Sequence, residues 1–377
     1  MRGRTVAGVV GALAVAAGAV AVMAPVVAGS AIRSSTLVTA AAAPARLPAA
    51  PLPATLRERW AAPGVGSVEA AVAGGSVVAA TADRITGRDP STGAERWSYR
   101  RSDARLCGWT ARDDVVVAVF ARAPACSEMI ALDAGTGARK WYRTADIGDS
   151  ATLTSANGVV VLRSGDRLLA VDTVTGLNRW TSSKPGCRYG PVEVGALGAA
   201  AAVRCGDGRT LVVTHDAYTD KELFSVAAPG TDATVVAVDQ SIAVLATVRG
   251  TPTLTLYDQR GRVQGRIVDR RLAPRPGARM AGEGAGHTVL VWTGAVVAAV
   301  DTRTRSVAWS VPALGPPTVD GERLLLAEPT GLVERFVTDG RPSRRATLGA
   351  EPPAGAILSR PGALVVATTP TGVTVYG

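Results

Sequence analysis

One short motif returns along the chain at nearly constant spacing, and this repetition restricts the possible folds more than any other feature. The strings ALDAGTGARKW at 131–141 and AVDTVTGLNRW at 170–180 share an aspartate, a Thr-Gly pair and a final tryptophan, and GRDPSTGAERW at 87–97 is close to them. A fixed period of this length is typical of a repeat architecture. The aspartate recurs at separations of 44, 39, 44, 42 and 43 residues, at Asp89, Asp133, Asp172, Asp216, Asp258 and Asp301.

The other recurring positions of the motif have a structural interpretation. A tryptophan follows four of the aspartates by eight residues, at Trp97, Trp141, Trp180 and Trp309, while Phe224 and Arg266 take that place in the fourth and fifth units. A glycine follows three of them by four residues, at Gly93, Gly137 and Gly176. Aspartate accepts hydrogen bonds from turn amides, glycine enters the left-handed region, and tryptophan can cover an outer strand against the next unit. The motif therefore predicts structure and not catalysis.

Each unit also contains short apolar runs that predict strands buried on both faces. Examples are VVVAVF at 115–120, VVVL at 159–162, IAVLAT at 242–247 and VLVW at 289–292. Turns rich in Gly and Asp separate the runs. Four short strands in each unit, repeated radially, predict an all-β fold of the β-propeller type.

The two ends of the chain decide the number of blades. Trp60, in LRERW at 56–60, resembles the last strand of a unit that lacks its earlier strands, and the C-terminal sequence supplies inner strands and then stops. Pairing of 56–60 with 371–376 would complete one blade and close the ring. We therefore expect an eight-bladed propeller over residues 56–377, with seven blades as the alternative because the last two units match the motif weakly.

The N-terminus predicts a membrane segment. Arg2 and Arg4 precede an uncharged stretch of 28 residues from Thr5 to Ile32, and a helix needs about 20 apolar residues to span a bilayer. Residues 1–33 are therefore predicted to be a transmembrane signal-anchor with a cytoplasmic n-region and an extracytoplasmic propeller. A cleaved signal peptide, which would release a secreted protein, is the alternative. Residues 34–55 are rich in Ala and Pro, and we expect them to form an extended linker.

The four cysteines fall at matching positions of two units. Cys107 and Cys126 lie 19 residues apart, and Cys187 and Cys205 lie 18 apart two units later. The first of each pair begins an inner strand, and the second follows the next strand. Antiparallel pairing brings these positions together, so we predict the disulfides Cys107–Cys126 and Cys187–Cys205, which an exported domain would permit. Four buried free thiols are the alternative.

The motif A-x-D-x-x-T-G-x-x-x-W resembles the repeat of the pyrroloquinoline quinone (PQQ)-type propellers. That family includes quinoprotein alcohol dehydrogenases and the non-catalytic lipoprotein scaffold of the outer-membrane β-barrel assembly machinery. The resemblance implies the propeller fold over about 320 residues. Catalytic members use a calcium site, a catalytic aspartate and often two adjacent cysteines, and this sequence has no adjacent cysteines. We therefore expect no enzyme activity, no cofactor, and no catalytic or metal-binding residues.

The net charge of the chain says little about which kind of partner it binds. The formal charge is +10, with basic residues spread along the chain, and no aromatic residues alternate with a basic patch as single-strand nucleic-acid binding would need. We expect a membrane-tethered scaffold that binds another cell-envelope protein. The alternatives are a propeller that binds a small, quinone-type ligand and one that binds an anionic cell-wall glycan.

Overall fold

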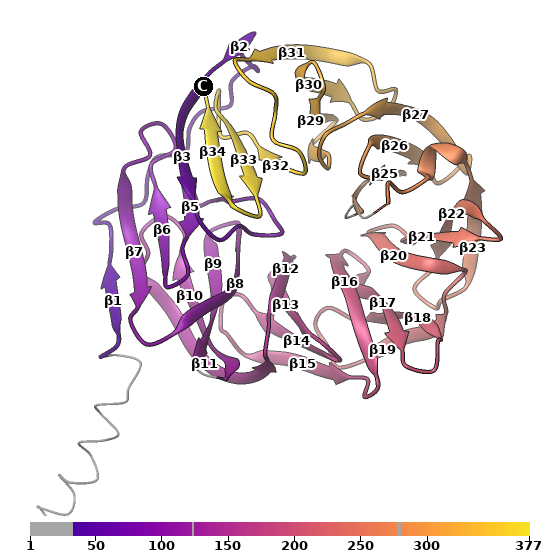
Figure 1. Cartoon of the computed structure of the whole chain (residues 1–377), viewed down its shortest axis with the longest axis horizontal. Helices are drawn as coiled ribbons and strands as arrows, with labels where there is room; N and C mark the ends of the chain where they lie inside the picture. The colour runs from indigo at the N-terminus through magenta and orange to yellow at the C-terminus, as the bar shows by residue number, and fades with distance from the viewer. Residues whose placement is uncertain (1–32, 123, 277–279) are drawn as a thin grey trace, which may run out of the picture.

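The strands of the protein form eight sheets arranged in a ring (Figure 1). The structure is a computed structural model, and it describes residues 33–122, 124–276 and 280–377. The fold is an eight-bladed β-propeller, so the main prediction from the repeat is confirmed and the seven-bladed alternative is wrong. Neighbouring strands within each blade pair antiparallel, and the first strand of each blade faces the central channel.

The first four blades follow one another directly along the chain. Blade 1 contains β4 (Val72–Ala73), β5 (Ser76–Ala80), β6 (Arg84–Arg88) and β7 (Glu95–Arg101). Blade 2 contains β8 (Arg105–Arg112), β9 (Val115–Arg122), β10 (Ala125–Asp133) and β11 (Arg139–Gly148). Blade 3 contains β12 (Thr152–Ala156), β13 (Val159–Ser164), β14 (Arg167–Asp172) and β15 (Asn178–Ser183). Blade 4 contains β16 (Cys187–Gly195), β17 (Gly198–Cys205), β18 (Thr210–His215) and β19 (Glu222–Ala227).

The remaining blades have the same order from the channel outward. Blade 5 contains β20 (Thr231–Val238), β21 (Ile242–Val248), β22 (Thr251–Tyr257) and β23 (Val263–Val268), and a short 3-10 helix η1 (Arg270–Leu272) follows it. Blade 6 contains β24 (Ala281–Ala285), β25 (Thr288–Trp292), β26 (Val296–Asp301) and β27 (Ser306–Pro312). Blade 7 contains β28 (Thr318–Asp320), β29 (Arg323–Glu328), β30 (Gly331–Phe336) and β31 (Pro342–Leu348). Blade 8 contains β32 (Ile357–Ser359), β33 (Val365–Thr369), β34 (Gly372–Tyr376) and, outermost, β3 (Glu58–Pro63).

The two ends of the chain meet in blade 8. Strand β3 pairs antiparallel with β34, with Glu58 opposite Tyr376 and Pro63 opposite Gly372. An N-terminal strand thus completes a blade whose three inner strands come from the C-terminus. This is the ring closure that the sequence of the chain ends predicts.

A tryptophan on the outer strand of one blade docks on the repeat turn of the next. Trp97 has no exposed surface, and its Nε1 donates to the carbonyl oxygen of Ala134 at 2.9 Å. Beneath it lies Gly137, with φ of 73°, where a Cβ would come 2.7 Å from the indole. The carboxylate of Asp133 holds this turn by accepting from the backbone and side chain of Thr136, each at 2.9 Å. Corresponding indole-to-carbonyl bonds join Trp60 to Pro90, Trp141 to Thr173, Trp180 to Ala217, and Trp309 to Val337.

The contact is reversed between blades 5 and 6. The repeat turn of blade 5 is one residue shorter than the others. The amide of Asp258 bonds to the carbonyl of Arg262, four residues further on, whereas the corresponding bond in the other repeat turns spans five residues. The eight-residue spacing predicts Arg266 at the tryptophan position. Because of the shorter turn, the residue at that position is Gly265. The side chain of Arg305, from the next turn, lies over Gly265 at 3.0 Å from where a Cβ would be. The large residue here comes from the turn, and the small one from the strand.

Residues 33–56, which include the predicted linker 34–55, lie against the propeller. Strand β1 (Ser35–Val38) pairs antiparallel with β7, and β2 (Thr55–Leu56) pairs parallel with β31. Between them, the amide of Ala40 bonds to the carbonyl of Thr136 at 2.9 Å, and Leu52 is buried. The Ala- and Pro-rich composition does give an extended chain. Its carbonyl groups and small side chains, however, find partners on the propeller.

Both predicted disulfides are present. Cys107 on β8 bonds to Cys126 on β10, and Cys187 on β16 bonds to Cys205 on β17. Each bond stays within one blade, in blades 2 and 4, and no described cysteine is free. The alternative of buried thiols is wrong.

The predicted membrane anchor lies outside the described residues, apart from Arg33. Within the described part of the chain, no helix has the length and apolar character needed to span a bilayer.

We expect Trp97→Ala to lower the free energy of unfolding by about 3–5 kcal/mol, because the change leaves a large cavity between two blades. Urea unfolding followed by intrinsic fluorescence measures this. Val268→Ala, at a residue that is 64% exposed, is the control and should change the free energy by less than about 0.5 kcal/mol. Equal effects of the two substitutions would contradict the docking role.

Candidate functional site

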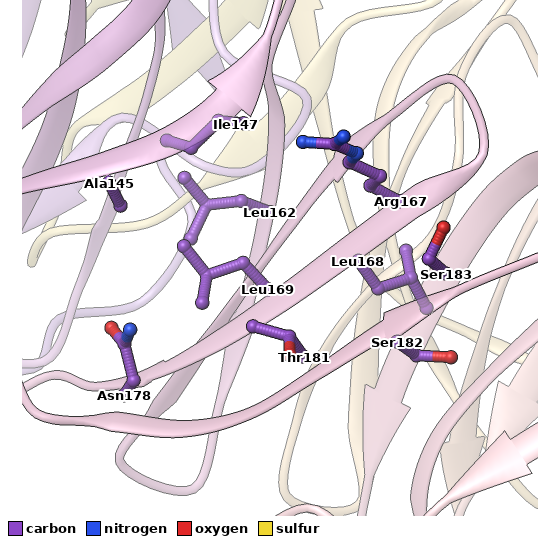
Figure 2. Close-up of a pocket in the computed structure, with 10 residues that line it drawn as sticks. All are labelled: Ala145, Ile147, Leu162, Arg167, Leu168, Leu169, Asn178, Thr181, Ser182 and Ser183. Carbon is purple, nitrogen blue, oxygen red and sulfur yellow. The ribbon is translucent and has the colours of Figure 1, made fainter.

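A groove of about 360 Å³ lies on the outer part of the ring between blades 2 and 3 (Figure 2). Its floor is apolar, since Ile147, Leu162 and Leu169 are buried side chains. Strand β15 supplies polar residues along one wall, from Asn178 at one end to Ser183 at the other. The groove can therefore take an apolar side chain and offer hydroxyl and amide groups to the backbone beside it. Its lining residues are Ala145, Ile147, Leu162, Arg167, Leu168, Leu169, Asn178, Thr181, Ser182 and Ser183.

Two exposed apolar side chains lie in the turn that precedes Asn178 in the chain. The repeat turn that precedes β15 carries Val174, which is 70% exposed, and Leu177, which is 58% exposed. Leu177 is the neighbour of Asn178 in the chain. Large exposed apolar residues close to a groove are typical of a surface that binds another protein.

The wall of the groove is an open sheet edge. In blade 3, β15 is the outermost strand, and no strand of the described chain pairs with its outer side. Blades 1 and 7 have the same outer edge, but there β1 and β2 of the chain itself add to it. The protein thus shows twice that an extended segment can pair with the outer edge of a blade.

A second concentration of polar groups lies where the inner strands meet at the channel. Glu69, from the loop before β4, reaches across blade 2 to blade 3, where its Oε1 accepts from the amide of Ser155 at 2.9 Å. Its Oε2 accepts from the hydroxyl groups of Ser155, at 2.7 Å, and Thr110. Burial raises the pKa of Glu69 although these hydrogen bonds oppose the rise. The carboxyl group satisfies an inner-edge amide that has no strand partner.

Glu283 does the same for blade 7. It lies on β24, and its Oε2 accepts from the amide of Val319 on β28 at 3.0 Å. Burial raises the pKa of Glu283 to about 7, while the hydrogen bond from Val319 and the charge of Arg112 oppose the rise and that of Asp239 adds to it. Because Arg112 is on blade 2, the groups that act on Glu283 come from several sides of the channel.

The residues singled out by the sequence lie elsewhere. The aspartates, glycines and tryptophans of the repeat form turns and docking contacts between blades, and the cysteines form intra-blade disulfides. His215 is buried and stacks on Trp180 with ring centroids 4.7 Å apart. Sequence reasoning missed Glu69 and Glu283. Each is the single charged residue of its inner-strand region, in GVGSVEAAVAGG and AGEGAG, and that isolation is the signal that could have found them.

Comparison with known proteins agrees with the repeat. Residues 50–214 match the family model described as outer membrane protein assembly factor BamB.

Residues 50–214 thus resemble the PQQ-type propellers.

Solved structures show the same fold over most of the length of the chain. BamB from Moraxella catarrhalis is 15% identical, with a TM-score of 0.54 over 85% of this chain and 99% of that one. The computationally designed Ika8 protein is also 15% identical, with a TM-score of 0.61 over 86% of this chain and 99% of its own. At such identities the likeness concerns the fold alone. A search of curated proteins finds no match.

The described acidic, histidine and cysteine side chains do not gather into a metal-ligand cluster. Among the described residues, no group of three or more His, Cys, Asp or Glu side chains could hold a metal ion. The carboxylate of Glu69 already accepts three hydrogen bonds from blades 2 and 3. The cysteines are paired within blades.

We expect the stability of the protein to depend on pH through Glu283. Its folded pKa, about 7, lies above the ordinary 4.5 of the unfolded chain. The folded state therefore binds more protons between these values, and the free energy of unfolding falls as pH rises from 4.5 to 7. Glu283→Gln should remove that fall and raise stability at pH 8 by about 1–2 kcal/mol. Unfolding curves across this pH range measure it.

The exposed Glu351→Gln serves as the matched control and should leave the wild-type profile unchanged. A Glu283→Gln profile parallel to that of the wild type would show that the pKa of Glu283 is the same in the folded and unfolded protein, and would contradict the prediction.

Proposed function

We propose that this propeller is a non-catalytic scaffold, tethered to the membrane outside the cytoplasm, that binds an extended segment of another cell-envelope protein along the outer edge of β15. The observation that carries the proposal is the apolar groove beside that open edge, with exposed Val174 and Leu177 in the turn that precedes β15. An extended segment that pairs with an edge strand presents alternate side chains to one face. One of these would enter the groove over Leu162 and Leu169.

The location rests on two features of the chain. Two disulfides favour an oxidising compartment, which lies outside the cytoplasm. The uncharged stretch from Thr5 to Ile32 is long enough to anchor the protein in a membrane, and the arginines before it favour a cytoplasmic N-terminus. Strand β1 pairs with the outer edge of blade 1, so an anchor would lie at the rim of the ring.

Binding of proteins agrees with the family that the first half of the chain matches. The printed description of that family is an assembly factor. For the present chain we propose the same class of role, with the partner defined by its chemistry: a segment of alternating apolar and polar residues that is free to add as a strand.

A photocrosslinking residue at position 181 in the native membrane tests the proposal. Thr181 is exposed and directly follows Trp180 on β15, so a partner in the groove would lie within reach. Ser225 is the matched control, because it is exposed and directly follows Phe224 on β19. We expect one envelope protein to crosslink from position 181 and not from 225.

Charge placed in the groove should weaken binding of the partner. Thr181→Arg should weaken the complex at least about tenfold, because the larger charged side chain obstructs the apolar floor. A tenfold loss of affinity corresponds to about 1.4 kcal/mol. Ser225→Arg should leave the complex intact. Quantitative capture of the identified partner by each variant measures this. The same crosslinks from both positions, or unchanged capture by Thr181→Arg, would overturn the proposal.

A further inference from the structure

The junction of blades 5 and 6 differs from its neighbours in what fills it. At five other junctions an indole docks on the repeat turn, and between blades 4 and 5 the ring of Phe224 lies over Gly261. Here Gly265 stands at the tryptophan position. The slender side chain of Arg305 replaces the indole over Gly265. A pocket of about 480 Å³ opens beside it, with Gln240, Ser241, Gln264, Arg303 and Arg305 among its lining residues. The absence of one aromatic ring thus coincides with a polar cavity.

The charge of this pocket is positive and only partly balanced. Arg305 forms no ion pair with any residue of the described chain, and the Nε of Arg303 lies 4.0 Å from Asp301 Oδ1. That aspartate oxygen already accepts from the amides of Arg303 and Thr304, at 2.7 and 3.1 Å. The nearby Asp258 pairs with Arg262 at 2.7 Å. The guanidinium groups of Arg303 and Arg305 are therefore available to an anion.

A buried hydroxyl group points to a ligand independently of the charge. Ser241 is only 5% exposed, and its Oγ has no hydrogen-bond partner among the described residues. A buried hydroxyl without a partner is unfavourable, and most such groups in folded proteins are satisfied. Ser241 lines this pocket, so a ligand held there could supply the missing partner.

We propose that this pocket binds an anionic sugar unit, a phosphate- or carboxylate-bearing saccharide. Guanidinium groups match the planar spacing of carboxylate and phosphate oxygens, so Arg303 and Arg305 hold the anionic group. The amides of Gln240 and Gln264 and the hydroxyl of Ser241 both donate and accept, as sugar hydroxyl groups require. The volume lies within the range of small-molecule sites. The pocket shares no residue with the groove between blades 2 and 3, so this proposal stands apart from the scaffold function.

Calorimetric titration of the full chain in detergent, with defined sugars, tests the site. We expect saturable binding of glucose 1-phosphate or glucuronate, at least about tenfold tighter than that of glucose or inorganic phosphate. Preference between the two anionic sugars identifies the source of the charge. Equal binding of inorganic phosphate, or no saturable binding of either anionic sugar, would overturn the proposal.

Substitutions locate the site. Arg305→Gln and Ser241→Ala should each weaken binding about tenfold or more, whereas Arg345→Gln, an exposed residue on β31, removes the same charge without effect. The double substitution Gly265→Trp with Arg305→Gly restores the contact seen at other junctions, fills the pocket, and should abolish binding. Unchanged affinity in Arg305→Gln and Ser241→Ala would overturn the assignment of these residues, even if the double variant failed to fold.

Discussion

The docking of an outer-strand tryptophan on the repeat turn of the next blade is the contact on which the ring depends. A single blade is a small sheet that cannot bury both faces alone. The indole covers the space between two blades, its N–H bonds to a carbonyl of the next turn, and a glycine with positive φ lets the ring lie flat on that turn. The aspartate holds the turn in the shape that receives it. Trp60 repeats the arrangement across the closure of the ring, where strands from both ends of the chain form one blade.

The same contact explains where the functional surfaces occur. Between blades 5 and 6, where Gly265 and Arg305 reverse the contact, a pocket lined by arginine and glutamine opens. Between blades 2 and 3, Trp141 docks on the repeat turn, and the groove lies beyond it, over Leu162 and Leu169. A rigid ring can carry such sites because their walls belong to different blades whose relative position is fixed by docking. The segment 33–56 uses the ring in the same way, adding strands to the outer edges of blades 1 and 7.

Much of the fold could be predicted from the sequence because its determinants are local and periodic. The spacing of aspartate, glycine and tryptophan predicts the repeat turn and the docking contact directly. The spacing of the cysteines predicts which positions antiparallel pairing brings together. The site could not be predicted in the same way. The groove combines Ile147 with Leu169, and Glu69 reaches Ser155 across an intervening blade. These contacts depend on how blades face each other. The one-residue shortening of the turn after Asp258 also moved the docking position from Arg266 to Gly265, which spacing alone could not show.

Hydrogen exchange of the backbone amides of β15 tests the central claim most directly. The measurement compares the purified full-length protein with the same protein in its native membrane, where a partner is present. The account predicts that outward amides within Asn178–Ser183 exchange more slowly in the membrane, while those of β19, Glu222–Ala227, exchange at the same rate in both. Equal exchange of β15 in the two samples would contradict strand addition at this edge, and with it the scaffold role assigned to the groove.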